Sequence, residues 1–102
     1  MRRSVEVSQA ARQDLIDTIA YLTAENWRAA QSVEARLTSA MAELASRAEQ
    51  FPVVADRASR GICRRVVGSY NIFYEIRGAR VVILRVLHGA RDASRLMDGD
   101  ED

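Results

Sequence analysis

The sequence predicts an α+β domain in which one strand and two helices precede a three-stranded antiparallel meander. Two changes of period support this order. Apolar residues recur every three or four positions from Ser8 to Ala48, as in amphipathic helices, whereas beyond Ile62 they alternate with a period of two. A length of 102 residues, 48% of them hydrophobic, suits one domain with a modest core. We expect residues 1–97 to form it and residues 98–102 to be a disordered acidic tail.

The first two elements are a short strand and a helix. Ser4 to Val7 alternates valine with polar residues, which is typical of a strand. Ser8 follows as a plausible N-cap, because its hydroxyl can accept a hydrogen bond from a free backbone N–H of the first turn. The apolar stripe of this helix consists of Ala11, Leu15, Ile19 and Leu22.

A second helix follows after a short turn. The segment Thr23 to Asn26 interrupts the first stripe, and Asn26 can cap the next helix. Two helices joined by so short a turn form an αα-hairpin. Pro52 disfavours helical geometry at the residue before it, so the second helix should end near Glu49 or Gln50. Its apolar stripe consists of Ala30, Val33, Leu37, Met41, Leu44 and Ala48.

The C-terminal half is read as a loop and three strands. Val53 to Arg60 shows no periodicity and is interpreted as a solvated loop. Gly68 with Ser69 and Gly78 with Ala79 then separate runs rich in β-branched and aromatic residues. Two-residue linkers that begin with glycine suit type II′ hairpin turns. The three predicted strands are Ile62 to Val67, Tyr70 to Arg77 and Arg80 to His88.

Two-residue turns fix the pairing of these strands. Ile72 should lie between Arg65 and Arg85, and Phe73 between Arg64 and Leu84. The more apolar face should receive the helices, and it comprises Cys63, Val67, Tyr70, Ile72, Tyr74, Ile76, Val81, Ile83 and Leu87. The other face comprises Ile62, Arg64, Val66, Asn71, Phe73, Glu75, Val82, Leu84, Val86 and His88.

Two consequences follow from this division into faces. Two helices cannot cover both faces, so Phe73, Leu84 and Val86 should form an exposed apolar patch, which usually marks an interaction site. Arg65 and Arg85 fall on the helix-packed face, where an unpaired guanidinium is costly. We expect them to pair with helix carboxylates such as Asp14 or Asp17.

Charge is unevenly distributed along the chain. The formal net charge is +1, yet the segment from Arg57 to Arg95 holds nine arginines and two acidic residues, a formal charge of +7. Such a segment indicates a partner. One cysteine and one histidine exclude an internal disulfide and a His/Cys metal cluster, so neither a metal nor a cofactor is expected. No apolar run could span a bilayer, and a cytoplasmic location is expected.

Several segments in fixed order carry a resemblance to a known family. They are Ser8, Ala11, Asp14, Leu15, Ile19 and Tyr21 in the first helix, Phe51 with Pro52, VGSYNIFYEI from Val67 to Ile76, and LRVLHGARD from Leu84 to Asp92. On these residues the chain resembles the RelE/ParE toxin superfamily, and within it the ParE branch of type II toxin-antitoxin and plasmid-stabilisation systems. The resemblance implies the RelE/ParE fold and a cognate ParD-like antitoxin.

The resemblance offers two activities. RelE-like members are ribosome-dependent mRNA endonucleases, whereas ParE-like members inhibit DNA gyrase without known catalytic residues. The positions that serve the nuclease fall here on Ile62, Arg64, Asn71, Arg91 and Met97. Ile62 and Met97 can neither donate a charged hydrogen bond nor transfer a proton, and Asn71 is uncharged. The expected function is therefore gyrase inhibition by protein binding, without catalytic residues; the alternative is an mRNA endonuclease.

Candidate binding residues follow from these readings. His88 could restore proton transfer, but a structural role in shaping the following turn is the alternative. Trp27 could contact a partner or pack at the helix turn. Neither helix is basic along one face, so sequence-specific nucleic-acid binding is not expected. The protein should exist as a hetero-oligomer with its antitoxin. The gyrase-binding hypothesis names Arg64, His88, Arg91 and Arg95. The antitoxin-binding hypothesis names Leu15, Ile19, Leu22, Trp27, Phe73, Leu84 and Val86.

Overall fold

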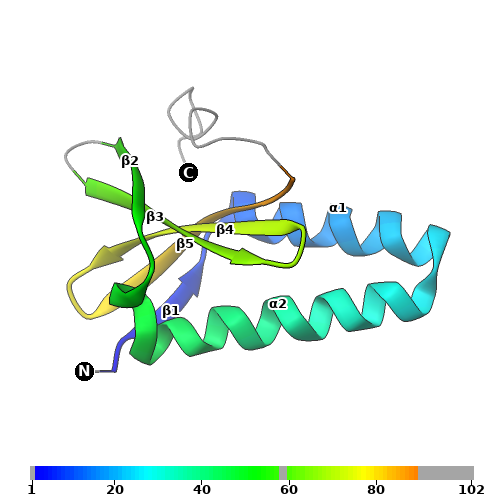
Figure 1. Cartoon of the computed structure of the whole chain (residues 1–102), viewed down its shortest axis with the longest axis horizontal. Helices are drawn as coiled ribbons and strands as arrows, with labels where there is room; N and C mark the ends of the chain where they lie inside the picture. The colour runs from blue at the N-terminus through cyan, green and yellow to red at the C-terminus, as the bar shows by residue number, and fades with distance from the viewer. Residues whose placement is uncertain (1, 58–59, 90–102) are drawn as a thin grey trace.

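A computed structural model describes residues 2–57 and 60–89 of the chain, which form one mixed five-stranded sheet with a helical hairpin (Figure 1). The elements are β1 (Ser4–Val7), α1 (Gln9–Glu25), α2 (Trp27–Arg47), a 3₁₀ turn (Ala48–Gln50), β2 (Val53–Arg57), β3 (Arg60–Val67), β4 (Tyr70–Arg77) and β5 (Arg80–His88). The sheet order is β1-β5-β4-β3-β2, with β1 parallel to β5 and every other pair antiparallel. The far end of the helical hairpin, at the right of Figure 1, extends beyond the strands.

The predicted starts of both helices and the end of the second are confirmed, whereas α1 continues through Thr23 to Glu25, which were expected to interrupt it. The Ser8 hydroxyl accepts a hydrogen bond from the Ala11 backbone N–H at 3.1 Å, which caps α1. The Asn26 side chain accepts bonds from the N–H groups of Arg28 and Ala29 at 3.0 and 3.3 Å, and so caps α2. Helical geometry continues through the 3₁₀ turn and ends at Gln50, two residues before the proline.

The sheet also follows the predicted hairpins at both turns. Gly68 and Gly78 have φ angles of 59° and 60°, the positive values that glycine adopts readily at the first position of such turns. The predicted pairs Arg65 with Ile72 and Arg64 with Phe73 are present.

The interpretation of Val53 to Arg60 as a loop is wrong, because Val53–Arg57 is strand β2 and pairs with β3. Val53 faces Cys63 and Ala55 faces Ile62, so the register shifts between Val53 and Ala55. This irregularity breaks the alternation of side chains, which is why the segment carries no period-two signal.

The predicted register of β5 is correct only for its first half. Tyr74 faces Ile83 as expected, but Phe73 then faces Arg85, so Leu84 is an extra residue in β5. This bulge makes wrong the predicted pairs of Phe73 with Leu84 and of Ile72 with Arg85. It also reverses the faces of the residues that follow.

The core therefore has two parts, one on each face of the sheet. The helix-side cluster consists of Ala11, Leu37, Ala40, Met41, Leu44, Ala48, Cys63, Ile72, Tyr74, Val81, Ile83 and Val86. The second-face cluster consists of Ile62, Phe73, Val82, Leu84 and Leu87, with Ala55 packed against it. Val86 and Leu87 have exchanged the faces that strict alternation assigned to them.

The expectation of an exposed apolar patch is wrong. Phe73, Leu84 and Val86 are all buried. Val86 reaches the helix side because of the bulge, where it joins the core beneath the helices. Phe73 and Leu84 pack with the other members of the second-face cluster, to which the unexpected strand β2 adds Ala55.

Candidate functional site

Helix α1 is attached to the bulged part of β5 through two backbone groups of that strand, beyond the point where β1 ends. The Ser8 hydroxyl donates to the Leu84 carbonyl at 3.0 Å, and the Val86 N–H donates to Asp14 Oδ2 at 2.9 Å. Asp14 also accepts from Arg85 Nε and Nη2 at 2.8 and 2.9 Å. A bidentate, charge-assisted contact of this kind fixes orientation as well as adding stability. The predicted pairing of Arg85 with Asp14 is confirmed, and these contacts set the position of α1 over the end of β5.

Arg65 has a comparable role on α2. Its Nη1 donates to the Ala40 carbonyl at 2.9 Å, and its Nη2 lies 2.8 Å from Glu43 Oε1. The guanidinium carbon lies 4.8 Å from the centroid of the Phe51 ring. The carboxylate partner comes from α2 and not from α1, because β3 lies beneath the C-terminal half of α2. Arg65 is thus engaged in holding the helix.

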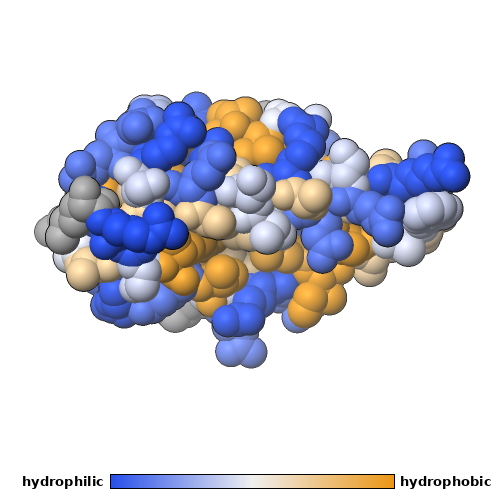
Figure 2. Space-filling view, turned by 90° about the horizontal axis from the view of Figure 1, so that it is seen from below, coloured by the Kyte–Doolittle hydropathy of each residue, from blue (hydrophilic) through white to orange (hydrophobic). Residues whose placement is uncertain are grey.

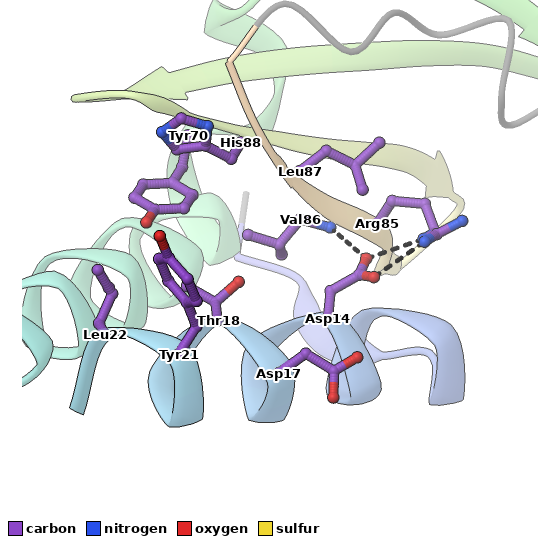
Figure 3. Close-up of a pocket in the computed structure, with 10 residues that line it drawn as sticks. All are labelled: Asp14, Asp17, Thr18, Tyr21, Leu22, Tyr70, Arg85, Val86, Leu87 and His88. Atoms are coloured by element: carbon purple, nitrogen blue, oxygen red, sulfur yellow. Dashed lines mark hydrogen bonds and ion pairs between the residues drawn. The ribbon is translucent and has the colours of Figure 1, made fainter. Parts of the chain in front are cut away.

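A groove of about 620 Å³ lies between α1 and the ends of β4 and β5, and we call it the α1–β5 groove (Figure 3). Its lining residues are Asp14, Asp17, Thr18, Tyr21, Leu22, Tyr70, Arg85, Val86, Leu87 and His88. The groove exists because α1 ends beyond the sheet, so that its second half is covered on one side only.

Two tyrosines and the histidine gather at one end of this groove. The Tyr70 and His88 rings are edge to face, with centroids 5.0 Å apart. In Figure 3 the Tyr21 hydroxyl, from α1, points toward that of Tyr70. Burial and the neighbouring Tyr21 phenol raise the pKa of Tyr70 above its usual value, so its hydroxyl stays protonated at neutral pH. His88 was expected on the opposite face, and the bulge accounts for this difference.

A second, more apolar groove of about 440 Å³ lies between the two helices, and we call it the α1–α2 groove. It is lined by Leu15, Ile16, Ile19, Ala20, Glu34 and Thr38. Leu15 and Ile19 belong to the sequence-predicted antitoxin set, whereas Ile16 was missed because it lies outside the apolar stripe. Ile16 is 60% exposed, and this isolated apolar residue on the outer side of a helix was the available signal.

The other members of the antitoxin set lie elsewhere. Leu22 lines the α1–β5 groove. Trp27 is exposed at the hairpin turn, where the Arg28 guanidinium carbon lies 5.1 Å from its ring centroid. Figure 2, in which the molecule is seen from below, shows apolar surface in separate areas between charged side chains and a mostly hydrophilic hairpin tip. On the face seen in this view, the exposed apolar residues thus do not form one continuous patch.

The two described members of the gyrase-binding set, Arg64 and His88, lie on opposite faces of the sheet. Arg64 lies on the second face opposite Phe73, half-buried, and its buried Nε has no hydrogen-bond partner among the described residues. His88 lies on the helix side, in the α1–β5 groove. Arg91 and Arg95 lie outside the described residues, as does the acidic segment 98–102.

A buried carboxylate accompanies the arginines of the second face. Glu75 is almost fully buried and forms ion pairs with Arg77 and with Arg60, whose Nε lies 3.6 Å from Glu75 Oε1. A buried charge is tolerated only when it is paired in this way. These two arginines are therefore partly neutralised, which lowers the effective positive charge of that face.

Two of the positions that the resemblance assigns to a nuclease are filled by core residues. Ile62 is fully buried in the second-face cluster. Asn71 is also buried, and its side-chain amide donates to the Gly89 carbonyl at 2.5 Å. Neither side chain can reach a substrate. The positions Arg91 and Met97 lie outside the described residues.

Residues 2–57 and 60–89 lack two kinds of feature. In these ranges no three or more His, Cys, Asp or Glu side chains converge as metal ligands would. No helix in the same ranges is long and apolar enough to cross a membrane.

Comparison with solved structures shows two toxin-antitoxin systems with this fold. The chain is similar to a protein chain in the solved structure of the chromosomal ParDE toxin-antitoxin system from P. aeruginosa. The TM-score is 0.70 at 17% sequence identity, and the alignment covers 86% of this chain and 97% of that chain. It is also similar to a protein chain in the RelBE2 toxin-antitoxin complex from Mycobacterium tuberculosis. The TM-score is 0.62 at 25% sequence identity, and the alignment covers 88% of this chain and 94% of that chain. No curated protein matches the sequence.

A family model also matches most of the chain. The model described as the ParE toxin of the type II toxin-antitoxin system parDE matches residues 5–93, which includes every strand and helix described above apart from Ser4, the first residue of β1. The chain has the α+β fold of ParE and RelE toxins, and it belongs to the ParE toxin family of type II toxin-antitoxin systems.

Proposed function

We propose that this chain is a toxin that binds DNA gyrase and thereby blocks replication, and that a ParD-like antitoxin neutralises it in the cytoplasm. Membership of the ParE family supports the toxin part of the proposal. Protein binding in place of catalysis is supported by the second face of the sheet, which carries a packed apolar cluster where a nuclease needs an open basic surface. A role in plasmid stabilisation would follow from such a toxin-antitoxin pair.

One observation carries the choice of a non-catalytic mechanism. Ile62 and Asn71 occupy positions that must offer charged donors in an RNA endonuclease, and both are buried and committed to the fold. A general acid or an oxyanion donor has to lie within hydrogen-bond reach of the reacting atoms. These residues cannot meet that condition without unfolding the cluster around Phe73.

The second candidate is an mRNA endonuclease. The specific observation in its favour is the likeness to the RelBE2 complex, at 25% identity over 88% of this chain. His88 is exposed and could exchange protons. It lies, however, on the opposite face from Arg64, so the described part of the chain does not place these two residues around one phosphate.

The antitoxin is proposed to bind the α1–α2 groove. Leu15, Ile16 and Ile19 present apolar surface there, and an amphipathic helix can bury its apolar face in such a groove. Because most of α1 is only partly buried in the chain alone, covering it would stabilise the toxin by mass action. A toxin-antitoxin hetero-oligomer is then the expected resting state.

The deciding experiment compares two reactions with one toxin preparation. Purified gyrase is assayed for supercoiling, and ribosome-programmed mRNA is assayed for cleavage. We expect loss of supercoiling with intact mRNA, and relief of inhibition in Arg64→Ala. Arg12→Ala, which changes an exposed arginine on α1, is the matched control and should inhibit as well as the parent chain. Cleaved mRNA together with undiminished supercoiling would reject the gyrase proposal.

A further inference from the structure

The α1–β5 groove has a residual negative charge within the described residues. Asp14 and Arg85 neutralise each other through two hydrogen bonds, and both side chains are largely buried. Asp17 remains as an exposed carboxylate at the rim, and it accepts a bond from the uncharged Gln13 amide at 2.8 Å. With His88 neutral, the formal charge of the lining is therefore −1.

The opposite end of the groove supplies acceptors and aromatic faces. Tyr21 is 68% exposed and Tyr70 is half-buried, and Figure 3 shows their hydroxyls directed toward each other. Neutral phenols can accept hydrogen bonds from a charged N–H donor, and the face of a tyrosine ring attracts a cation. Thr18 adds a hydroxyl on the same side of α1. Apolar side chains, among them Leu22 and Val86, form the floor against which an alkyl stem could lie.

We propose that the α1–β5 groove binds an arginine or lysine side chain of the antitoxin, with the charged group against the two tyrosines and attracted by the Asp17 carboxylate at the rim. The inference rests on the proposed function only for the identity of that polypeptide. An anionic side chain would meet Asp17 and a guanidinium that Asp14 already binds. A purely apolar side chain would leave the phenols and the carboxylate without new partners.

The groove is tested first with the toxin alone and three small probes. N-acetyl-arginine amide, N-acetyl-glutamate amide and N-acetyl-norleucine amide are titrated into isotopically labelled protein, and NMR shifts of the Tyr21, Tyr70 and His88 rings are followed. The arginine probe should bind most tightly and shift these rings. Asp17→Asn and Tyr21→Leu should each weaken its binding roughly 3- to 30-fold. Tyr21→Phe, which keeps the ring, should lose less than Tyr21→Leu.

Glu25→Gln is the matched control, because it removes an exposed carboxylate from the same helix outside the groove. It should leave binding of the arginine probe unchanged. The proposal is overturned if the glutamate or norleucine probe binds as tightly as arginine, if the shifts fall on other residues, or if Glu25→Gln weakens binding as much as Asp17→Asn. None of these results depends on gyrase, so failure of the groove and failure of the proposed toxin target are distinguishable.

Discussion

Asp14 and Arg85, 71 positions apart in the sequence, are joined by two hydrogen bonds of 2.8 and 2.9 Å. The same carboxylate accepts the backbone N–H of Val86, so one side chain serves both the cation and the backbone of the bulge. This contact connects the helix that lines both grooves to the strand that ends at His88. The shape of the α1–β5 groove therefore depends on the contact between Asp14 and Arg85.

Removing the carboxylate should destabilise the protein strongly. Asp14→Ala removes the carboxylate that accepts from the largely buried Arg85 guanidinium and from the Val86 backbone N–H, and we expect a loss of about 3 kcal/mol in the free energy of unfolding. Urea denaturation measures it. Asp17→Ala, one turn further along the same helix but exposed, should change the free energy by less than about 0.5 kcal/mol. Similar losses for the two variants would contradict the role given to Asp14.

The two helix caps should differ in their contribution. Ser8 accepts from the first turn of α1 and also donates a part-buried hydrogen bond to the Leu84 carbonyl, whereas the two bonds that Asn26 accepts are exposed and belong to the cap of α2 alone. Loss of a cap costs about 1 kcal/mol, and loss of a second hydrogen bond adds about 1 kcal/mol more. Ser8→Ala should therefore destabilise the chain about twice as much as Asn26→Ala in thermal or urea unfolding. Equal effects would show that the contact with the bulge contributes nothing.

The packing of the second face is directly measurable. Phe73→Ala should cost about 3–5 kcal/mol and Leu84→Ala about 2–4 kcal/mol, because each leaves a cavity in a buried cluster. Val66→Ala on the neighbouring strand is the control; Val66 is 59% exposed, and its truncation should cost less than about 1 kcal/mol. A near-neutral Phe73→Ala would mean that the face is open after all.

Stability should fall in alkaline solution. Burial is the main cause that raises the pKa of the Cys63 thiol and of the Tyr74 phenol, whose hydroxyl donates to the Ala48 carbonyl. The unfolded chain then loses these protons first, from about pH 9 for the thiol and about pH 10 for the phenol, so it binds fewer protons than the native state. The free energy of unfolding should decline by up to about 1.4 kcal/mol per pH unit for each group.

Urea unfolding between pH 7 and pH 11 measures this decline. The variant Tyr74→Phe lacks the phenol, so it should start from a lower stability at pH 7 and decline less steeply above pH 10. A parent chain whose stability is constant up to pH 11 would contradict the pKa shifts on which the prediction rests.

Antitoxin binding should depend on Ile16. The substitution Ile16→Asp places a charge in the α1–α2 groove without disturbing the core, because Ile16 is mostly exposed. Affinity for the antitoxin encoded beside the toxin should fall at least about tenfold in calorimetry, since a central apolar contact is replaced by a charge that binding must desolvate. Val66→Asp, at an equally exposed valine on another surface, should bind like the parent chain. If the Ile16→Asp variant binds the antitoxin as tightly as the parent chain, the antitoxin binds a different surface.

The order of most elements could be predicted because each has a local signal. Ser8 and Asn26 are N-caps, and Gly68 and Gly78 take positive φ angles at tight turns, so helix starts and hairpins can be recognised from a few residues. The partner of Arg85 could be narrowed to a helix carboxylate such as Asp14 or Asp17, since a guanidinium on a helix-packed face needs an anion, and it is Asp14 in the structure.

The errors arise where the signal is not local. Neither bulge contains a glycine, so the residues around Leu84 and between Val53 and Ala55 carry no sequence signal for a change of register. Because this extra residue was not detected, Val86 and His88 were assigned to the wrong faces, and Val86 was wrongly counted in the apolar patch. Whether Ile62 and Phe73 are exposed depends on how the whole sheet packs, which no short segment of sequence determines.

The bulge also has a consequence for changes of chain length within β5. A strand buried in the middle of a sheet normally tolerates no deletion, because every later side chain then turns to the other face. Here the chain already contains one residue more than its partner strand requires. Deletion of Arg85 together with a neutral residue in place of Asp14 would restore a regular ladder and still leave Val86, Leu87 and His88 on the faces they now occupy. Relatives that are one residue shorter at this point can therefore share the core and the groove while lacking the ion pair altogether.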